Sequence, residues 1–203
     1  MVETLSLAVI GDPGVGKTSI IRQFLYNDFT EVYTPTNSRY VYRPSVILNG
    51  NMFDLKIMEV PPISSFPAST CQEWLDLRCH GVRTASAYIL VYDICCMESF
   101  EYIKMIRQQI VDNRASNSGE APILVVGSKR DLQRQRFTSR RAVSLLVKKT
   151  WKCGYIECSA KYNWHITLLF KELLASAVAR GLKRNHSSIR LQGALHRNRC
   201  SIM

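Results

Sequence analysis

Hydrophobic residues along the chain occur in two kinds of pattern. Short, almost wholly apolar runs at 5–10, 88–92 and 123–126 are typical of strands that are buried on both faces of a parallel sheet. A shorter run at 154–158 has the same character. Between these runs, apolar side chains recur at the spacing of amphipathic helices. The clearest helical stripes comprise Ile20, Ile21, Phe24 and Leu25; Phe100, Ile103, Ile106 and Ile110; and Leu169, Phe170, Leu173, Leu174 and Ala177.

Two further strands are predicted on either side of Asn49-Gly50, a dipeptide that favours tight hairpin turns. They cover about 39–48 and 52–58, so the order of elements is β-α-β-β-α-β-α-β-α-β-α. This order predicts an α/β fold of the doubly wound type, with helices on both faces of a mostly parallel six-stranded sheet and one antiparallel strand pair near an edge. We expect one domain over residues 1–180, followed by a basic, mobile tail over 181–203.

The most specific chemical signal directly follows the first predicted strand. Residues 11–18 match G-x-x-x-x-G-K-[ST], the phosphate-binding loop of P-loop NTPases. In such a loop the backbone N–H groups point inward, and the next helix directs its positive end at the phosphates. Lys17 would contact the β- and γ-phosphates, and Thr18 would bind Mg²⁺. The residues assigned to this part of the site are Gly11, Asp12, Pro13, Gly14, Val15, Gly16, Lys17, Thr18 and Ser19.

Composition and charge narrow the range of partners. The formal net charge is +11, and six of the cations lie from Arg180 onward, where there is no acidic residue. This distribution favours an anionic membrane surface over a nucleic-acid duplex, so no nucleic-acid partner is expected. The seven cysteines show no paired spacing, which favours reduced cytosolic thiols over zinc or disulfides. No secretory signal or bilayer-spanning stretch is expected.

Two later segments follow predicted strands and carry further motifs. They read Ser128-Lys129-Arg130-Asp131 and Ser159-Ala160-Lys161. These two segments resemble the N-K-x-D and S-A-K motifs of the Ras superfamily of small GTPases, which also has a phosphate loop. The resemblance covers roughly residues 3–180 and includes the final motif of the tail. The amino-acid sequence over 151–165 is most similar to that of the divergent Ras-like family ten branch. The resemblance implies GTP or GDP and Mg²⁺ as ligands, and a role in signalling or regulated trafficking.

The same resemblance implies roles at the guanine base. Asp131 would accept hydrogen bonds from guanine N1–H and the 2-amino group, donors that adenine lacks. The Lys129 stem would cover the base, the Ala160 N–H would meet guanine O6, and Phe29 would set an aromatic edge beside it. Ser128 stands where the family usually has asparagine. Its shorter side chain loses about 0.5–1.5 kcal/mol per missing hydrogen bond, which weakens binding without changing the preferred base.

The first switch of the family corresponds to Tyr33-Thr34-Pro35-Thr36. Thr36 would close on Mg²⁺ and the γ-phosphate when GTP is bound. The following Asn37-Ser38-Arg39 lacks the acidic pair with which Ras engages basic effector edges. Because Arg39 reverses the local charge, effectors that read the acidic Ras switch should be disfavoured.

The second switch departs further from the family. Glu59-Val60-Pro61-Pro62-Ile63-Ser64 stands where D-T-A-G-Q-E is expected. Glu59 would still reach Mg²⁺ through a water. Pro62 replaces a glycine that donates its N–H to the γ-phosphate, and proline has no N–H. Ile63 replaces the glutamine that orients the attacking water, which an alkyl chain cannot do. We therefore predict weak GTP hydrolysis and assign no catalytic residue beyond supporting roles for Lys17 and Thr36.

One alternative keeps hydrolysis intact. Residues of the longer loop, from Ser64 to Cys71, would then supply the missing groups, and Gln72-Glu73 superficially echo the family's Gln-Glu. Pro13 adds an open question, because this loop position limits the approach of an arginine finger from an activating protein.

The chain ends in Cys200-Ser201-Ile202-Met203, which fits a C-a-a-X prenylation motif with the methionine that favours farnesyl. One lipid chain binds membranes only marginally, so the basic tail would supply the second signal. We expect lipidation at Cys200 and attachment to the cytoplasmic face of the cell membrane. The alternative is a nuclear or nucleolar location directed by the basic tail.

The leading hypothesis is therefore a monomeric, membrane-anchored small GTPase with unidentified effectors. A pseudo-GTPase scaffold, in which nucleotide only supports the structure, is the alternative. Effector binding that is equal in the GDP and GTP forms would favour the scaffold. A P-loop nucleotide kinase is disfavoured by the guanine-reading motifs and by the lack of an arginine-rich lid.

Overall fold

The computed structural model describes residues 3–48, 50–114 and 121–180. Its strands are β1 (Glu3–Gly11), β2 (Tyr40–Tyr42), β3 (Ser45–Leu48), β4 (Asn51–Glu59), β5 (Ala87–Asp93), β6 (Ile123–Ser128) and β7 (Gly154–Glu157). Its helices are α1 (Lys17–Tyr26), α2 (Thr70–Leu75), α3 (Met97–Arg114), α4 (Arg140–Leu145) and a last described helix over 166–180. Shorter helical segments are η1 (Leu77–Cys79), η2 (Arg130–Gln135) and the π-helical η3 (Leu146–Thr150).

The strands form one sheet in the order β2-β4-β1-β5-β6-β7, with β3 also paired to β4. Only β2 and β3 run antiparallel to their neighbour. The predicted α/β fold, mostly parallel with an antiparallel pairing at one edge, is thereby confirmed.

The sheet holds seven described strands instead of the predicted six, because the expected strand at 39–48 is broken into β2 and β3. The break falls at Arg43-Pro44, and Pro44 has no N–H to donate to a ladder. The Pro44 carbonyl still accepts a hydrogen bond from the Leu55 N–H at 2.8 Å. The hairpin prediction is confirmed, because Leu48 lies opposite Asn51 and Gly50 takes a left-handed φ of 80°.

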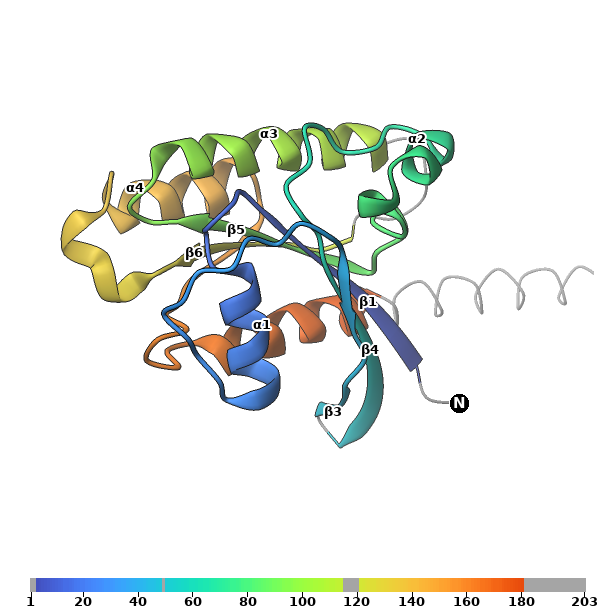
Figure 1. Ribbon diagram of the computed structural model, residues 1–203, viewed down its shortest axis with the longest axis horizontal. Helices are drawn as coiled ribbons and strands as arrows, with labels where there is room; N and C mark the ends of the chain where they lie inside the picture. Colours follow the sequence, from blue (N-terminus) through green and yellow to red (C-terminus); the bar gives the residue numbers. More distant parts are fainter. Residues whose placement is uncertain (1–2, 49, 115–120, 181–203) are drawn as a thin grey trace, which may run out of the picture.

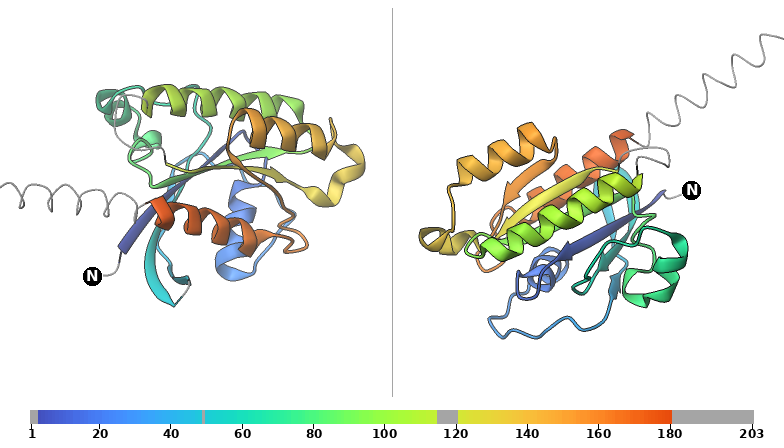
Figure 2. Two further views of the ribbon diagram at one scale, coloured as in Figure 1. Left: turned by 180° about the vertical axis from the view of Figure 1, so that it is seen from behind. Right: turned by 90° about the horizontal axis from the view of Figure 1, so that it is seen from above.

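Helices cover both faces of the sheet (Figures 1 and 2). On one face, α1 packs beside the helix over 166–180, and the rings of Phe24 and Phe170 stack at 3.9 Å. On the other face, α3 and α4 cover the strands. The three predicted helical stripes lie in these two apolar layers, so each of them is core.

The parallel strands end at a common edge of the sheet, which gathers the loops that carry the predicted motifs. These loops follow β1, β4, β6 and β7. Among the described helices, none is both long and apolar enough to cross a membrane. The predicted tail over 181–203, with Cys200, lies outside the described residues.

Candidate nucleotide-binding site

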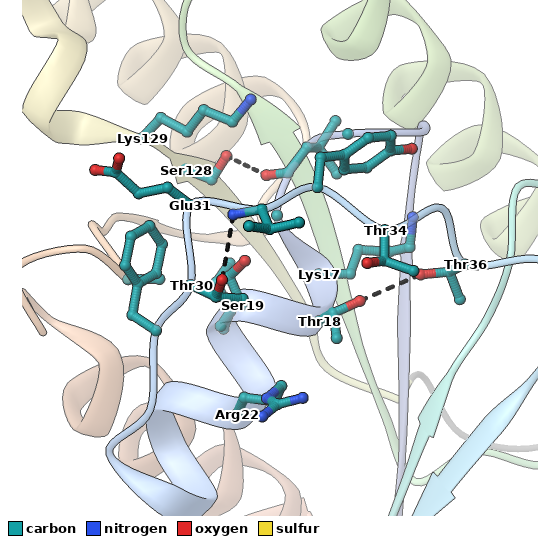
Figure 3. A pocket seen from close by; sticks show the side chains of 18 of the residues that line it. Lys17, Thr18, Ser19, Arg22, Thr30, Glu31, Thr34, Thr36, Ser128 and Lys129 are labelled. Atoms are coloured by element: carbon teal, nitrogen blue, oxygen red, sulfur yellow. Dashed lines mark hydrogen bonds between the residues drawn. The ribbon is translucent and has the colours of Figure 1, made fainter.

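A cavity of about 490 Å³ opens at the carboxyl edge of the sheet (Figure 3). Its size is typical of small-molecule sites. Five segments that are distant in sequence line it together: the loop after β1 with the start of α1, the loop after α1, and the segments after β4, β6 and β7. From the predicted site, the lining residues are Pro13, Gly14, Val15, Gly16, Lys17, Thr18, Ser19, Phe29, Thr36, Ser128, Lys129, Asp131, Ala160 and Lys161. The other predicted residues, Gly11, Asp12, Glu59 and Ser159, are not among the lining residues.

The phosphate loop curls as its sequence predicts. Gly14 and Gly16 take left-handed φ values of 71° and 94°, which other residues adopt only with strain. Gly16 begins α1 without any side-chain cap, so the first N–H groups of the helix remain directed at the cavity. This positive helix end suits an anion such as a phosphate.

Lys17 lies deep in the loop and is only 5% exposed. Its ammonium donates to the carbonyls of Gly11 at 2.9 Å and Asp12 at 3.1 Å, which explains how these two residues serve the site from outside its lining. Burial lowers the pKa of Lys17, while the charges of Glu59 and Asp12 act in the opposite direction. A cation held in this way is a preformed partner for phosphate oxygens.

Three oxygen-bearing side chains meet beside the phosphate loop. The Thr18 hydroxyl donates to Glu59, and the Thr36 hydroxyl lies 3.2 Å from Thr18 Oγ1 and 3.0 Å from Glu59 Oε1. Glu59 is fully buried and also accepts from the Tyr42 hydroxyl at 3.2 Å. Burial, with the nearby Glu59 charge, raises the pKa of Tyr42 to about 12, so this phenol stays protonated.

This set of oxygens fits a hard cation such as Mg²⁺. Within the described residues there is no cluster of three His, Cys, Asp or Glu side chains suited to a metal. A cation here would therefore depend on the hydroxyls of Thr18 and Thr36, the single carboxylate of Glu59 and ligands from a bound phosphate. That division is usual for Mg²⁺, which takes few ligands from the protein.

The opposite end of the cavity holds the residues predicted to read the base. Asp131 accepts a hydrogen bond from the Ser159 hydroxyl at 2.6 Å, so Ser159 positions this carboxylate from behind. Lys129 takes a left-handed φ of 58° and its ammonium pairs with Asp93 at 2.8 Å, which leaves its stem along the cavity. Ala160 completes this end of the lining.

Ser128 has a contact that the sequence did not predict. Its hydroxyl donates to the Val15 carbonyl at 2.5 Å, and its side chain is buried (Figure 3). This bond ties the end of β6 to the phosphate loop. The serine at this position therefore links the two ends of the cavity.

From Ile63 onward, the second switch is held away from the cavity. Pro62 lines it, but Ile63 is 2% exposed and packs in the core between the sheet and α3. The Tyr102 hydroxyl of α3 lies 3.1 Å from the Ile63 N–H and 3.0 Å from its carbonyl. The next part of the segment is tied to α3 as well, because the Phe66 N–H donates to Gln109 Oε1 at 2.7 Å.

The alternative in which the longer loop supplies the missing groups gains no support. Gln72 Oε1 accepts from the Ala68 N–H at 2.8 Å, and Glu73 is buried and accepts from the Arg83 N–H at 2.9 Å. Neither residue, nor any from Ser64 to Cys71, lines the cavity. The carbonyl oxygen of the Gln72 side chain and the Glu73 carboxylate instead accept from backbone N–H groups outside the cavity lining.

A bridge across the mouth of the cavity was missed at the sequence level. Lys161 pairs with Glu31 at 2.6 Å, and the Asn163 amide donates to Asn27 at 3.0 Å. These contacts join the loop after α1 to the loop after β7. Exposed charged residues so far apart in sequence gave no signal of this pairing.

A second missed feature supports the base-reading loop. Glu157, 1% exposed at the end of β7, accepts both guanidinium N–H groups of Arg136 at 3.1 and 3.2 Å. It also accepts from the Tyr155 hydroxyl at 2.8 Å. This paired, hydrogen-bonded carboxylate fixes the strand directly before Ser159–Lys161.

A parallel sheet, a glycine-rich loop opening a helix and a cavity running from that loop to Asp131 define a P-loop nucleotide-binding protein. The Ras family profile matches residues 6–179, so the chain belongs to the Ras family of small GTPases. Guanine nucleotide binding follows from that membership.

Relatives support the finer resemblance. The chain is 59% identical to human Ras-like protein family member 10B, over the full length of both. It is 52% identical to mouse Ras-like protein family member 10A over 98% of each chain. GTP-binding protein drn-1 of Caenorhabditis elegans is 33% identical over 83% of this chain and 73% of its own. The predicted resemblance to the Ras-like family ten branch is confirmed.

Proposed function

We propose that this chain is a Mg²⁺-dependent guanine-nucleotide-binding signalling protein that holds GTP and cleaves it slowly. One observation carries the proposal. The cavity has a complete phosphate loop and base-reading end, but the residue in the glutamine position, Ile63, is buried in the core. The site therefore has the residues that nucleotide binding requires, but it lacks the glutamine that would assist hydrolysis.

The residues of the chain would divide the work of binding. Lys17 and the N-terminus of α1 would neutralise and orient the phosphates, and Asp131, fixed by Ser159, would select guanine. Thr18, Thr36 and Glu59 would hold Mg²⁺. When bound, the cation would offset phosphate charge and help to draw Thr36 over the γ-phosphate.

Hydrolysis would lack two contributions. Without a glutamine, nothing from the second switch orients the attacking water, and Pro62 has no N–H to offer a γ-phosphate oxygen. The protein would spend longer in its GTP form than a Ras protein that has both groups.

A pseudo-GTPase scaffold remains the second candidate, and a specific observation favours it. Tyr102 and Gln109 tie the second switch to α3 at Ile63 and Phe66. A segment held in this way would respond little to the identity of the nucleotide. Hydrogen exchange at residues 60–66 decides between the two, because equal protection in the GDP and GTP-analogue forms supports the scaffold.

The membrane part of the proposal rests on the sequence of the tail. A farnesyl group on Cys200, with the basic residues upstream, would attach the protein to an anionic cytoplasmic membrane face. A Cys200→Ser variant is expected to move from the membrane fraction to the soluble fraction of cells. An unchanged distribution would contradict the anchor, and nuclear enrichment of the variant would favour the alternative location.

Nucleotide binding is tested by titrating purified protein with fluorescent GDP and GTP, with ATP as competitor. We expect guanine nucleotides to bind, excess ATP to compete poorly, and chelation of Mg²⁺ by EDTA to speed release. An Asp131→Ala variant is the matched probe of base selection, and it should lose affinity for guanine while Lys17 and the phosphate loop stay intact. Equal binding of ATP and GTP by the parent protein would contradict the proposal.

A further inference from the structure

The residues that we assign to the guanine base lie on two separate loops. Lys129 and Asp131 line the cavity from the loop after β6. Ala160 and Lys161 line it from the loop after β7. Arg130 lies between two lining residues but is not itself among them. Any influence of Arg130 on the base would therefore act through its neighbours.

The guanidinium of Arg130 stacks on an aromatic ring of the other loop. Its central carbon lies 4.8 Å from the centroid of the Trp164 ring, which is within the range of a cation–π contact. The backbone of Arg130 reaches the same loop, because its N–H donates to the Cys158 carbonyl at 3.0 Å. Arg130 therefore joins the two loops through both its backbone and its side chain.

Glu157 is the other group that could hold the Arg130 side chain, but it is farther from ideal geometry. Its carboxylate lies 4.0 Å from Arg130 Nε, which is too long for a hydrogen bond. The same carboxylate accepts two N–H groups of Arg136 at 3.1 and 3.2 Å, so it is satisfied without Arg130. The ring of Trp164 is therefore the partner that fixes the Arg130 guanidinium.

Trp164 in turn closes the loop that carries Ser159. The Ser159 N–H donates to the Trp164 carbonyl at 3.1 Å, and the Trp164 N–H donates back to the Ser159 carbonyl at 2.8 Å. Asn163 and His165, on either side of Trp164, have left-handed φ values of 51° and 58°, which are uncommon outside glycine. Because the Ser159 hydroxyl donates to Asp131 at 2.6 Å, this chain of contacts ends at the carboxylate assigned to the base.

We propose that Arg130 and Trp164 are positioning residues for base selection: their stacked side chains hold the two loops together and thereby fix Asp131 for guanine. This inference rests on the proposed role of Asp131 and adds two residues that do not line the cavity. Trp164 is 45% exposed, so little of the core depends on its side chain. Loss of the ring should therefore alter the two loops more than the stability of the fold.

A comparison of two bases reports the position of Asp131. Its carboxylate would accept from guanine N1–H and the 2-amino group, and hypoxanthine, the base of inosine diphosphate (IDP), lacks that amino group. A site built to bind a donor discriminates against the analogue without it, provided that the acceptor is held in place. A displaced Asp131 would thus lower the ratio of GDP affinity to IDP affinity. Damage to the phosphate loop would weaken both nucleotides equally.

The test measures the affinities of the full-length chain for GDP and IDP with Mg²⁺ present, by competition with fluorescent GDP. The test variant is Trp164→Leu, and Trp164→Phe is the conservative variant because it keeps an aromatic face for Arg130. The matched control is Trp74→Leu, which removes a tryptophan that is 62% exposed on α2, outside the cavity lining. An unchanged midpoint of thermal unfolding reports that each variant is folded.

We expect Trp164→Leu to bind GDP about 3- to 10-fold more weakly and to lower the ratio of GDP affinity to IDP affinity by at least about threefold. Trp164→Phe should keep most of the parental ratio, and Trp74→Leu should change neither quantity. Arg130→Gln should resemble Trp164→Leu. The double variant should be no worse than the poorer single variant, because the two side chains make one contact.

Two kinds of failure are distinguishable. If Trp164→Leu keeps the parental ratio, or weakens GDP and IDP equally, the positioning role is overturned while the proposed role of Asp131 stands. The same conclusion follows if Trp164→Phe loses as much of the ratio as Trp164→Leu. A parent chain that binds GDP and IDP with equal affinity would overturn both the role of Asp131 and this inference.

Discussion

Ser128 shows how a single residue joins the two ends of the site. Its buried hydroxyl holds the Val15 carbonyl of the phosphate loop, while its backbone begins the base-reading segment. The sequence comparison with asparagine revealed only the contacts that serine lacks. The contact that serine makes depends on how closely β6 approaches the loop, which only the folded chain defines.

We predict that Ser128→Ala accelerates GDP dissociation about fivefold, because one buried hydrogen bond contributes about 1 kcal/mol and its loss leaves the Val15 carbonyl without this donor. Stopped-flow release of fluorescent GDP measures the change. Ser64→Ala, at an exposed serine outside the cavity, is the control. Dissociation at the parental rate in Ser128→Ala would show that this bond does not support the loop.

At the level of individual residues, the sequence singled out segments that the fold brings together where a motif fixes the backbone. The phosphate loop and the two predicted base-reading segments line a common cavity. The supporting partners could not be predicted. Tyr102 and Arg136 act through contacts with Ile63 and Glu157, and nothing in the local pattern of either residue marks such a long-range partner.

Among the elements, the second switch is defined by its attachment to α3. Val60, Ile63 and Phe66 are buried in the layer between the sheet and α3, and Tyr102 holds the backbone of Ile63. The lost glutamine is therefore more than a change of side chain. The segment takes a path that directs position 63 into the core.

We predict that Ile63→Gln does not restore hydrolysis. The new amide would enter an apolar layer without partners, at a cost of about 1–3 kcal/mol in stability. Thermal unfolding should show a lower midpoint than for the parent, while the rate of GTP cleavage changes by less than about twofold. The matched control, Ser64→Gln, should leave both quantities unchanged because Ser64 is exposed. A tenfold faster cleavage by Ile63→Gln would refute this placement of the segment.

The loops around the cavity mouth form a second functional unit through the Lys161–Glu31 pair. We predict that Glu31→Gln and Lys161→Gln each accelerate nucleotide release by less than about fivefold, because exposed ion pairs contribute little and are weakened by salt. The double variant should release nucleotide no faster than the faster single variant. Release rates measured at low and high salt test this, and additive effects of the two changes would show that the pair does not act as one unit.

The order and type of most elements were predictable because β1, β5, β6 and β7 are apolar runs and three of the helices have a clear apolar stripe. The exception was the edge strand at 39–48. Its pattern continues across Pro44, and only the pairing with β4 reveals that the proline divides it into two strands. Edge strands carry less of the burial signal on which such predictions depend.

At the scale of the whole molecule, the features to which we assign functions lie at different edges of the sheet. Its carboxyl edge holds the nucleotide cavity, the edge strand β2 directly follows the first switch, and the edge strand β7 directly follows a basic segment over 129–152. The net charge of the chain does not reveal where the basic segment lies, because the slightly acidic remainder of the domain partly offsets its charge. A protein that cleaves GTP slowly, as we propose, would present its first switch for long periods.

The most direct test of this account is single-turnover hydrolysis of GTP bound to the purified chain with Mg²⁺ present. Unassisted Ras proteins cleave GTP at about 3–5 × 10⁻⁴ s⁻¹, and we predict a rate at least about tenfold lower for this chain, with tight binding retained. Cleavage at the ordinary Ras rate would contradict the claim that Pro62 and the buried Ile63 leave the site suited to holding GTP rather than cleaving it.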